Sequence, residues 1–246
     1  MLKINDDKTI FLLISSKHRE AILFPEIQVG NVSVAPSNHA KNLGVVFDSF
    51  MTMERQINTL VKQCYYHIRR IGKIKGSLTP EAKMIVVNAF IMTKLDYGNA
   101  LLVGLPKHLI RKLQCIQNAA AWIVSGARKY DHITPVLKQL HWLPVAKRID
   151  FKVLLLAYKC AHGLAPNYLT ELLEIQNPGK GLRSNRRLVF RVPKTQQVTY
   201  GDRAFCKAAS TLWNNLPEKI CNSATVDIFK RKLKTHLYTE AYDSKC

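Results

Sequence analysis

Residues 51–74 read MTMERQINTLVKQCYYHIRRIGKI, and within them the hydrophobic pattern takes on a helical period. The apolar side chains recur every three or four residues, which is the spacing of one face of an α-helix. These positions are Met53, Ile57, Leu60, Val61, Cys64, Ile68 and Ile71. Most of the basic residues, including Arg69, Arg70 and Lys73, lie outside this stripe. The segment therefore predicts an amphipathic helix with an apolar inner face and a basic outer face.

The preceding residues, 8–48, have the composition of short β-strands. KTIFLLIS (8–15) is an apolar run rich in β-forming residues, and IQVGNVSV (27–34) alternates on either side of Gly30-Asn31. Because this dipeptide tolerates the positive φ of a tight turn, the second segment predicts a β-hairpin. NLGVVFD (42–48) predicts a third strand, which runs from Leu43 to Phe47.

Helical patterns continue after residue 74. They cover residues 78–98, 106–126, 134–144, 145–163, 166–174, 202–217 and 225–242. Thr79, followed by Pro80, and Thr225 have the residue types expected at helix N-caps. The middle of the 78–98 segment is apolar nearly all round, so this helix is expected to be central and buried.

Residues 175–200 interrupt the helices with Gly, Pro and Asn and contain no acidic residue, which predicts a basic loop with one short strand. The predicted fold class is α+β, mainly α. A small antiparallel β segment is followed by a helical array and then by a C-terminal helical region that carries the basic loop. The predicted divisions are a β-rich segment 1–49, a helical region 50–130 and a C-terminal region 131–246.

Charge is the main functional indication in the composition. The chain of 246 residues has 37 Lys and Arg against 17 Asp and Glu, which gives a formal net charge of +20. Such an excess favours a polyanionic partner, RNA or DNA before an anionic membrane, although a soluble basic protein would also fit. The sequence has neither the run of about 18 apolar residues of a membrane span nor a signal peptide. We therefore expect an intracellular protein, cytoplasmic or nuclear.

Three basic clusters are the candidate nucleic-acid-binding residues. They are Arg69, Arg70, Lys73 and Lys75 at the end of the first helix, Arg183, Arg186, Arg187 and Arg191 in the loop, and Lys230, Arg231, Lys232 and Lys234 near the C-terminus. Each is expected to contact phosphate without regard to base sequence. Phe190, among the loop arginines, is expected to stack on a base. The alternative for any one cluster is an ordinary solvated face.

Catalytic motifs are weak by comparison. Asp6 and Asp7 form an adjacent acidic pair, which Asp48 could approach across the sheet to bind Mg²⁺. Adjacent strand residues point to opposite faces, however, and Asn5-Asp6-Asp7 is also a typical turn sequence. There is no HExxH, GxSxG or P-loop motif, and the six cysteines show no zinc spacing. We therefore predict no catalytic residue, no metal site and no cofactor.

An ordered set of segments resembles a known family. These segments are LKINDDKT (2–9), KNLGVVFDSFMTMERQI (41–57), LDYGNALLVGLP (95–106), LQCIQNAAAWIVSG (113–126), LHWLPVAKRIDFKVLLLAYKCAHGLAPNYL (140–169), GDRAFCKAASTLWNNLP (201–217) and FKRKLKTHLY (229–238). Together they resemble the C-terminal part of the reverse transcriptases of non-LTR, LINE-type retrotransposons of the jockey/CR1-like group. The resemblance spans nearly the whole chain, and the order of the segments is more specific than any one of them.

The resemblance implies a palm edge in residues 1–49, a helical thumb in residues 50–130 and a C-terminal region beyond it. In that family the thumb grips the template–primer duplex through its backbone. The fingers, the catalytic palm aspartates with their Mg²⁺ and the endonuclease have no counterpart here, so no catalytic residue is carried over. The family's Lys-Thr-Glu is Lys8-Thr9-Ile10, its basic residue after QNAAA is Trp122, and its AAPxLW is AASTLW.

Three hypotheses follow for the function. The first is an incomplete reverse transcriptase, inactive as a polymerase on its own, that binds RNA or DNA non-specifically. The second is an exapted helical protein–protein interaction module without nucleic-acid binding. The third is an autonomous metal-dependent nuclease or polymerase that uses Asp6, Asp7 and Asp48.

Overall fold

A computed structural model describes residues 5, 8–15, 25–127, 131–176, 188–196 and 200–243. The chain forms two compact units, Met1–Lys62 and Gln63–Cys246, which are described separately below. The described residues are mainly helical with small sheets, which confirms the predicted α+β, mainly α class. The predicted boundaries at residues 49 and 130 are not tested by this division and stay predictions.

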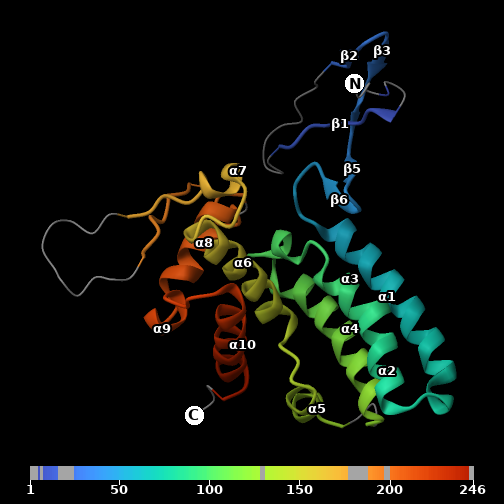
Figure 1. Ribbon diagram of the computed structural model, residues 1–246. Helices are drawn as coiled ribbons and strands as arrows, with labels where there is room; N and C mark the ends of the chain where they lie inside the picture. The colour runs from blue at the N-terminus through green and yellow to red at the C-terminus, as the bar shows by residue number, and fades with distance from the viewer. Residues whose placement is uncertain are drawn as a thin grey trace, which may run out of the picture. The chain divides into compact units, whose positions relative to one another are not determined.

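The described residues of the first unit form six short strands, arranged as three pairs. Their bounds are β1 (Phe11–Leu12), β2 (Ile27–Val29), β3 (Val32–Val34), β4 (Pro36–Ser37), β5 (His39–Asn42) and β6 (Val45–Asp48). β2 pairs with β3 and β5 with β6 in antiparallel register, whereas β1 and β4 form a two-residue parallel pair. The predicted hairpin is confirmed, and Gly30 adopts a φ of 59° in its turn (Figure 1).

The third predicted strand does not begin at Leu43. Asn42 is opposite Val45 in the β5–β6 register, so Leu43 and Gly44 form a two-residue turn, with φ values of 46° and 85°. Positive φ at both central residues is the geometry that matches the twist of paired strands, and it normally requires Gly or Asn. The sequence prediction treated Leu43 as a strand residue because apolar residues are rare at such positions.

The carboxylate of Asp48 organises the connection from β6 to the first long helix, α1 (Glu54–Ile74). One oxygen accepts hydrogen bonds from the backbone N–H groups of Phe50 and Thr52, at 3.1 and 2.9 Å. The other accepts from the Thr52 hydroxyl and the Met53 N–H, at 3.1 and 2.8 Å. Because all of these contacts are to its own turn, Asp48 has a structural role at the start of α1.

The predicted apolar stripe of α1 is confirmed. Met53, Ile57, Leu60, Cys64 and Ile71 are buried, and the other two positions of the stripe are half-buried. Burial raises the pKa of Cys64 to about 11, since the thiolate would lose its hydration. At neutral pH this cysteine is therefore a protonated core residue and not a reactive thiolate.

The second unit contains the remaining helices. Their bounds are η2 (Lys75–Ser77), α2 (Pro80–Val87), η3 (Asn88–Met92), α3 (Thr93–Asp96), η4 (Asn99–Leu102), α4 (Lys107–Ser125), α5 (Ile133–Gln139), α6 (Val145–Ala161), α7 (Asn167–Thr170), α8 (Phe205–Asn214), α9 (Glu218–Cys221) and α10 (Val226–Tyr242). Thr79 and Thr225 accept hydrogen bonds from the N–H groups of Ala82 and Ile228, which confirms both predicted N-caps. α6 packs against α4 and against α8 and α10 (Figure 1).

The helix predicted over residues 78–98 is neither continuous nor fully buried. A turn of π-helix, η3, separates α2 from α3. Val87, Ile91 and Leu95 are buried, but Ile85 is 67% exposed and Phe90 47% exposed. The prediction of a central helix was therefore wrong, because an apolar sequence shows which side chains could be buried and not whether a partner covers each face.

The core of the C-terminal half is aromatic. Trp213 of α8, Tyr158 of α6 and Phe229 of α10 are almost completely buried, and the rings of Tyr158 and Phe229 stack with centroids 4.2 Å apart. Trp213 and the neighbouring Asn214 also hold an extended segment that begins at residue 188. The indole N–H of Trp213 donates to the carbonyl of Leu188, and Asn214 bonds both the N–H and the C=O of Phe190.

Two glutamines of α4 fix the start of α6. Gln117 is fully buried and donates to the carbonyl of Leu143 at 2.9 Å, while its own oxygen accepts from Gln114. The Gln114 oxygen in turn accepts the N–H of Val145, which is among the N-terminal N–H groups of α6 that lack a partner within the helix. α4 therefore determines where α6 begins and how its side chains are presented.

Candidate nucleic-acid interface

The predicted cluster at the end of α1 lies on its outer face. Arg69, Arg70, Lys73 and Lys75 are all exposed. Arg70 is partly engaged within the helix, since its guanidinium donates to the Tyr66 hydroxyl at 2.5 Å and lies 5.4 Å from the centre of that ring. The structure therefore exposes this cluster as predicted, without forming a concave site from it.

Most of the predicted loop cluster, Arg183, Arg186 and Arg187, lies outside the described residues. Arg191 is described, and it forms an ion pair with Glu174 at 2.9 Å. Phe190 is 1% exposed, and its ring lies 5.5 Å from that of Trp213. The prediction that Phe190 stacks on a base is therefore wrong: its ring belongs to the core, and its position among arginines in the sequence was misleading.

The four cations of α10 do not share one face. Successive residues of a helix are separated by about 100° around its axis, so four cations within five residues are spread around it. Lys230 pairs with Asp227 at 3.2 Å, and Lys232 donates to the carbonyl of Lys219 at 2.9 Å. Arg231 and Lys234 are exposed. Of this cluster, Lys234 is the residue that meets cations from another helix.

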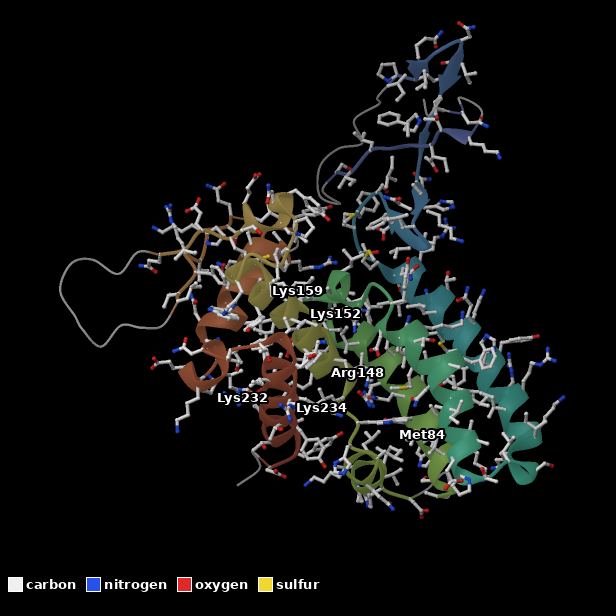
Figure 2. All side chains as sticks on the ribbon, in the orientation of Figure 1. Met84, Arg148, Lys152, Lys159, Lys232 and Lys234 are labelled. Carbon is white, nitrogen blue, oxygen red and sulfur yellow. The ribbon has the colours of Figure 1, made fainter. Side chains whose placement is uncertain are left out.

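Those other cations, on α6, were not among the predicted residues. Arg148, Lys152 and Lys159 are spaced by four and seven positions, which places them within about 40° of one another around the helix axis. Figure 2 shows their side chains along α6, with Lys232 and Lys234 of α10 nearby. These cations form no dense cluster in the sequence, and the signal that distinguishes them is positive charge repeated at helical spacing.

A cavity of about 360 Å³ opens where α6 meets α10. It is lined by Asp96 at the end of α3 and Asn99 at the start of η4, by His141, Trp142 and Leu143 from the turn before α6, by Arg148, Phe151 and Lys152 of α6, and by Lys234 of α10. Four separate segments of the second unit therefore contribute to one hollow.

The turn before α6 places two of these residues. His141 has a φ of 52°, its N–H bonds the carbonyl of Lys138, and the N–H of Trp142 bonds the carbonyl of Leu137, each at 3.0 Å. This paired arrangement ends a helix with a residue in the left-handed conformation, which histidine adopts more readily than most residues. The turn brings the Trp142 ring to the cavity wall.

Charge in the cavity is only partly compensated. Arg148 forms a two-pronged ion pair with Asp96, in which Nε donates to Oδ1 at 2.8 Å and Nη2 donates to Oδ2. No ion pair among the described residues involves Lys152 or Lys234. The cavity therefore carries an excess of two positive charges next to the apolar walls of Trp142, Leu143 and Phe151.

The described residues do not support a metal site. They contain no group of three or more His, Cys, Asp or Glu side chains that could hold a metal ion. Asp6 and Asp7 lie outside the described residues, and the Asp48 carboxylate is engaged by its own turn. None of the helices in the described part of the chain combines the length and the hydrophobicity that crossing a membrane requires.

Comparison with known proteins returned no relative. No family model, curated protein or solved structure matches this chain. The assignment of a function therefore depends on the residues and on their arrangement.

Proposed function

We propose that this chain is the C-terminal part of a non-LTR, LINE-type reverse transcriptase, and that it binds RNA or DNA through the sugar–phosphate backbone without polymerase activity of its own. The observation that carries the binding proposal is the row of cations on α6, Arg148, Lys152 and Lys159, next to Lys234 of α10. The family assignment is supported by the ordered sequence segments alone.

The arrangement of these cations is better suited to binding the sugar–phosphate backbone than to recognising a base sequence. A row of cations along one helix face can follow the regular spacing of phosphates, and lysine binds phosphate as a point charge without directional demands. The net charge of +20 adds a long-range attraction for any polyanion. The exposed cations at the end of α1 would extend the contact area.

The test is the salt dependence of binding to a labelled RNA–DNA hybrid, measured by fluorescence anisotropy. We expect the affinity to fall steeply from about 50 to 200 mM salt and to be similar for unrelated sequences. The double variant Lys152→Gln/Lys159→Gln should make the log–log slope shallower by about 1.4–1.8, since each lost phosphate contact contributes roughly 0.7–0.9.

The matched control for these variants is Lys230→Gln. Lys230 already pairs with Asp227, so its removal should change the slope by less than either α6 substitution. An affinity independent of salt, or no binding to any polynucleotide, would refute the binding proposal.

The second candidate, a protein–protein interaction module, is favoured by one observation. Tyr66 of α1, Ile85 of α2 and Phe90 of η3 are large side chains that stay exposed, and the ring of Phe90 stacks on that of His67 with the centroids 5.2 Å apart. Burial, together with the nearby Lys94 and Arg70, lowers the pKa of His67 and so favours its neutral form. This candidate predicts that nucleic acid does not bind and that Ile85→Lys abolishes capture of a defined protein.

A further inference from the structure

The cavity between α6 and α10 has chemistry that the backbone-binding proposal does not use. Its volume, about 360 Å³, is within the range of small-molecule sites. Phe151 and Trp142 supply aromatic surface, and Leu143 supplies an aliphatic wall. A flat ring would find apolar contact here, whereas a bare inorganic ion would leave these walls without a partner.

The charges define what else the ligand must carry. Asp96 and Arg148 neutralise each other, which leaves Lys152 and Lys234 as the uncompensated cations at the opening between the two helices. Two lysines from different helices that face one hollow favour an anionic group with several oxygens, such as a phosphate.

Asn99 adds a requirement for a hydrogen-bond donor. Its side chain lines the cavity and is 3% exposed, and its Nδ2 donates to Asp96 Oδ1 at 3.4 Å. This bond orients the amide, because the reverse orientation would face one oxygen with another. In the described part of the chain Asn99 Oδ1 then has no hydrogen-bond partner. A buried acceptor of this kind is normally satisfied, and a ligand N–H or O–H would satisfy it.

We infer that this cavity binds one phosphorylated nucleoside, with the phosphate on Lys152 and Lys234, a base or sugar donor on Asn99 Oδ1, and the base against Phe151 and Trp142. The inference deepens the proposed function, on which it rests, by separating a site for a single nucleotide from the general basic surface. The same chemistry is offered by a free mononucleotide and by the phosphorylated end of a strand.

The experiment is calorimetric titration of the full chain with adenosine 5′-monophosphate, with inorganic phosphate and with adenosine. We expect saturable binding of the monophosphate, at least tenfold tighter than that of either part. Lys152→Gln and Lys234→Gln should each weaken monophosphate binding about tenfold. Lys230→Gln is the matched control, since this lysine lies on α10 with Lys234 but pairs with Asp227 and does not line the cavity, and it should leave monophosphate binding unchanged.

Asn99→Ala tests the remaining contact. It should weaken binding of the monophosphate but not of inorganic phosphate, because only the former brings a donor to the Asn99 site. Far-UV circular dichroism verifies that the variant folds, and the exposed Lys152→Gln and Lys234→Gln variants provide the test if it does not. The inference is overturned by an absence of saturable monophosphate binding, or by monophosphate binding that is insensitive to all three substitutions.

Competition separates the two sources of the ligand. Displacement of the monophosphate by a 5′-phosphorylated oligonucleotide, but not by the same strand with a 5′-hydroxyl, would identify a strand end. Failure of both strands to displace it would identify a free nucleotide, and either result supports the site. The proposed function is tested separately. If the hybrid binds with a steep salt dependence but the monophosphate does not bind, only the inference fails. If the monophosphate binds but no polynucleotide does, only the proposed function fails.

Discussion

At the scale of single residues, Gly104 occupies a position that no other residue would fill without strain. Its φ is 68°, and a Cβ built on it would lie 2.7 Å from Cγ of Arg203. Arg203 cannot move away freely, because its guanidinium donates to the carbonyl of Val103 at 3.3 Å. We predict that Gly104→Ala lowers the free energy of unfolding by about 2–4 kcal/mol, from backbone strain and overpacking together.

Two other glycines separate these contributions in urea-unfolding experiments. Gly126 has a φ of 72° but open space around it, so Gly126→Ala should cost only the strain, about 1–2 kcal/mol. Gly76 has open space and no positive φ, so Gly76→Ala should leave stability unchanged or raise it by up to about 1 kcal/mol. Equal effects at all three positions would contradict this assignment.

Residue-level features were predictable where side-chain chemistry alone sets the conformation. Thr79 and Thr225 were predictable as N-caps because a hydroxyl at the start of a helix accepts a hydrogen bond from a backbone N–H of the first turn. Leu43 and His141 were not identified as left-handed residues, because neither type signals that conformation. Their φ values are imposed by the register of β5 with β6 and by the end of α5.

At the scale of elements, α8 holds an extended segment through the side chain of Asn214. Asn214 accepts from the N–H of Phe190 at 3.0 Å and donates to its carbonyl at 2.7 Å, as a neighbouring strand would. Phe190 itself is buried against Trp213. We predict that Asn214→Ala costs about 2–3 kcal/mol in urea unfolding, since it leaves two backbone groups of Phe190 without partners.

Asn215 provides the neighbouring control. It is exposed at the end of α8, so Asn215→Ala should change stability by no more than about 0.5 kcal/mol. Hydrogen exchange of the Phe190 amide should accelerate in the Asn214 variant and not in the Asn215 variant. An unchanged exchange rate in both variants would show that Asn214 does not hold the segment.

Elements were predictable in type but not in continuity or pairing. The long helices α1, α4, α6 and α10 follow from periodicity and end signals. The π-turn that divides residues 78–98 and the strand β5 have no such signal in their residue types. Propensity favours an element, and tertiary packing then sets its limits.

At the scale of the whole molecule, the two units differ in how much apolar surface they bury. The second unit has a continuous core in which Trp213, Phe229 and Leu233 are fully buried, whereas β2 and β3 form one pair of short strands with no buried residue. We predict that amides of α6 and α10 exchange with deuterium more than about a hundredfold more slowly than those of β2 and β3, measured by mass spectrometry. Similar protection in both units would contradict this expectation.

For the candidate site, the total charge could be predicted from the sequence, but the arrangement of the charges could not. The net charge of +20 is a sum and can be read from composition, and it favours nucleic acid. Whether two cations can act on one ligand depends on the angle between them around the helix axis and on whether each already has an acidic partner. The dense cluster on α10 is spread around its helix, while three widely spaced cations lie along α6, and two of them, Arg148 and Lys152, line the same cavity as Lys234.

The bridge beside Phe190 has a consequence for how the chain tolerates changes in length. The N–H of Gln176 bonds the carbonyl of Val189, and the N–H of Arg191 bonds the carbonyl of Glu174, each at 2.8 Å. Residues 174–176 and 189–191 are therefore joined directly by main-chain hydrogen bonds. The entropic cost of joining two such points rises only with the logarithm of the number of residues between them, so doubling that number costs about 0.6 kcal/mol. A peptide label inserted between the anchors is therefore expected to leave the aromatic core beneath them intact.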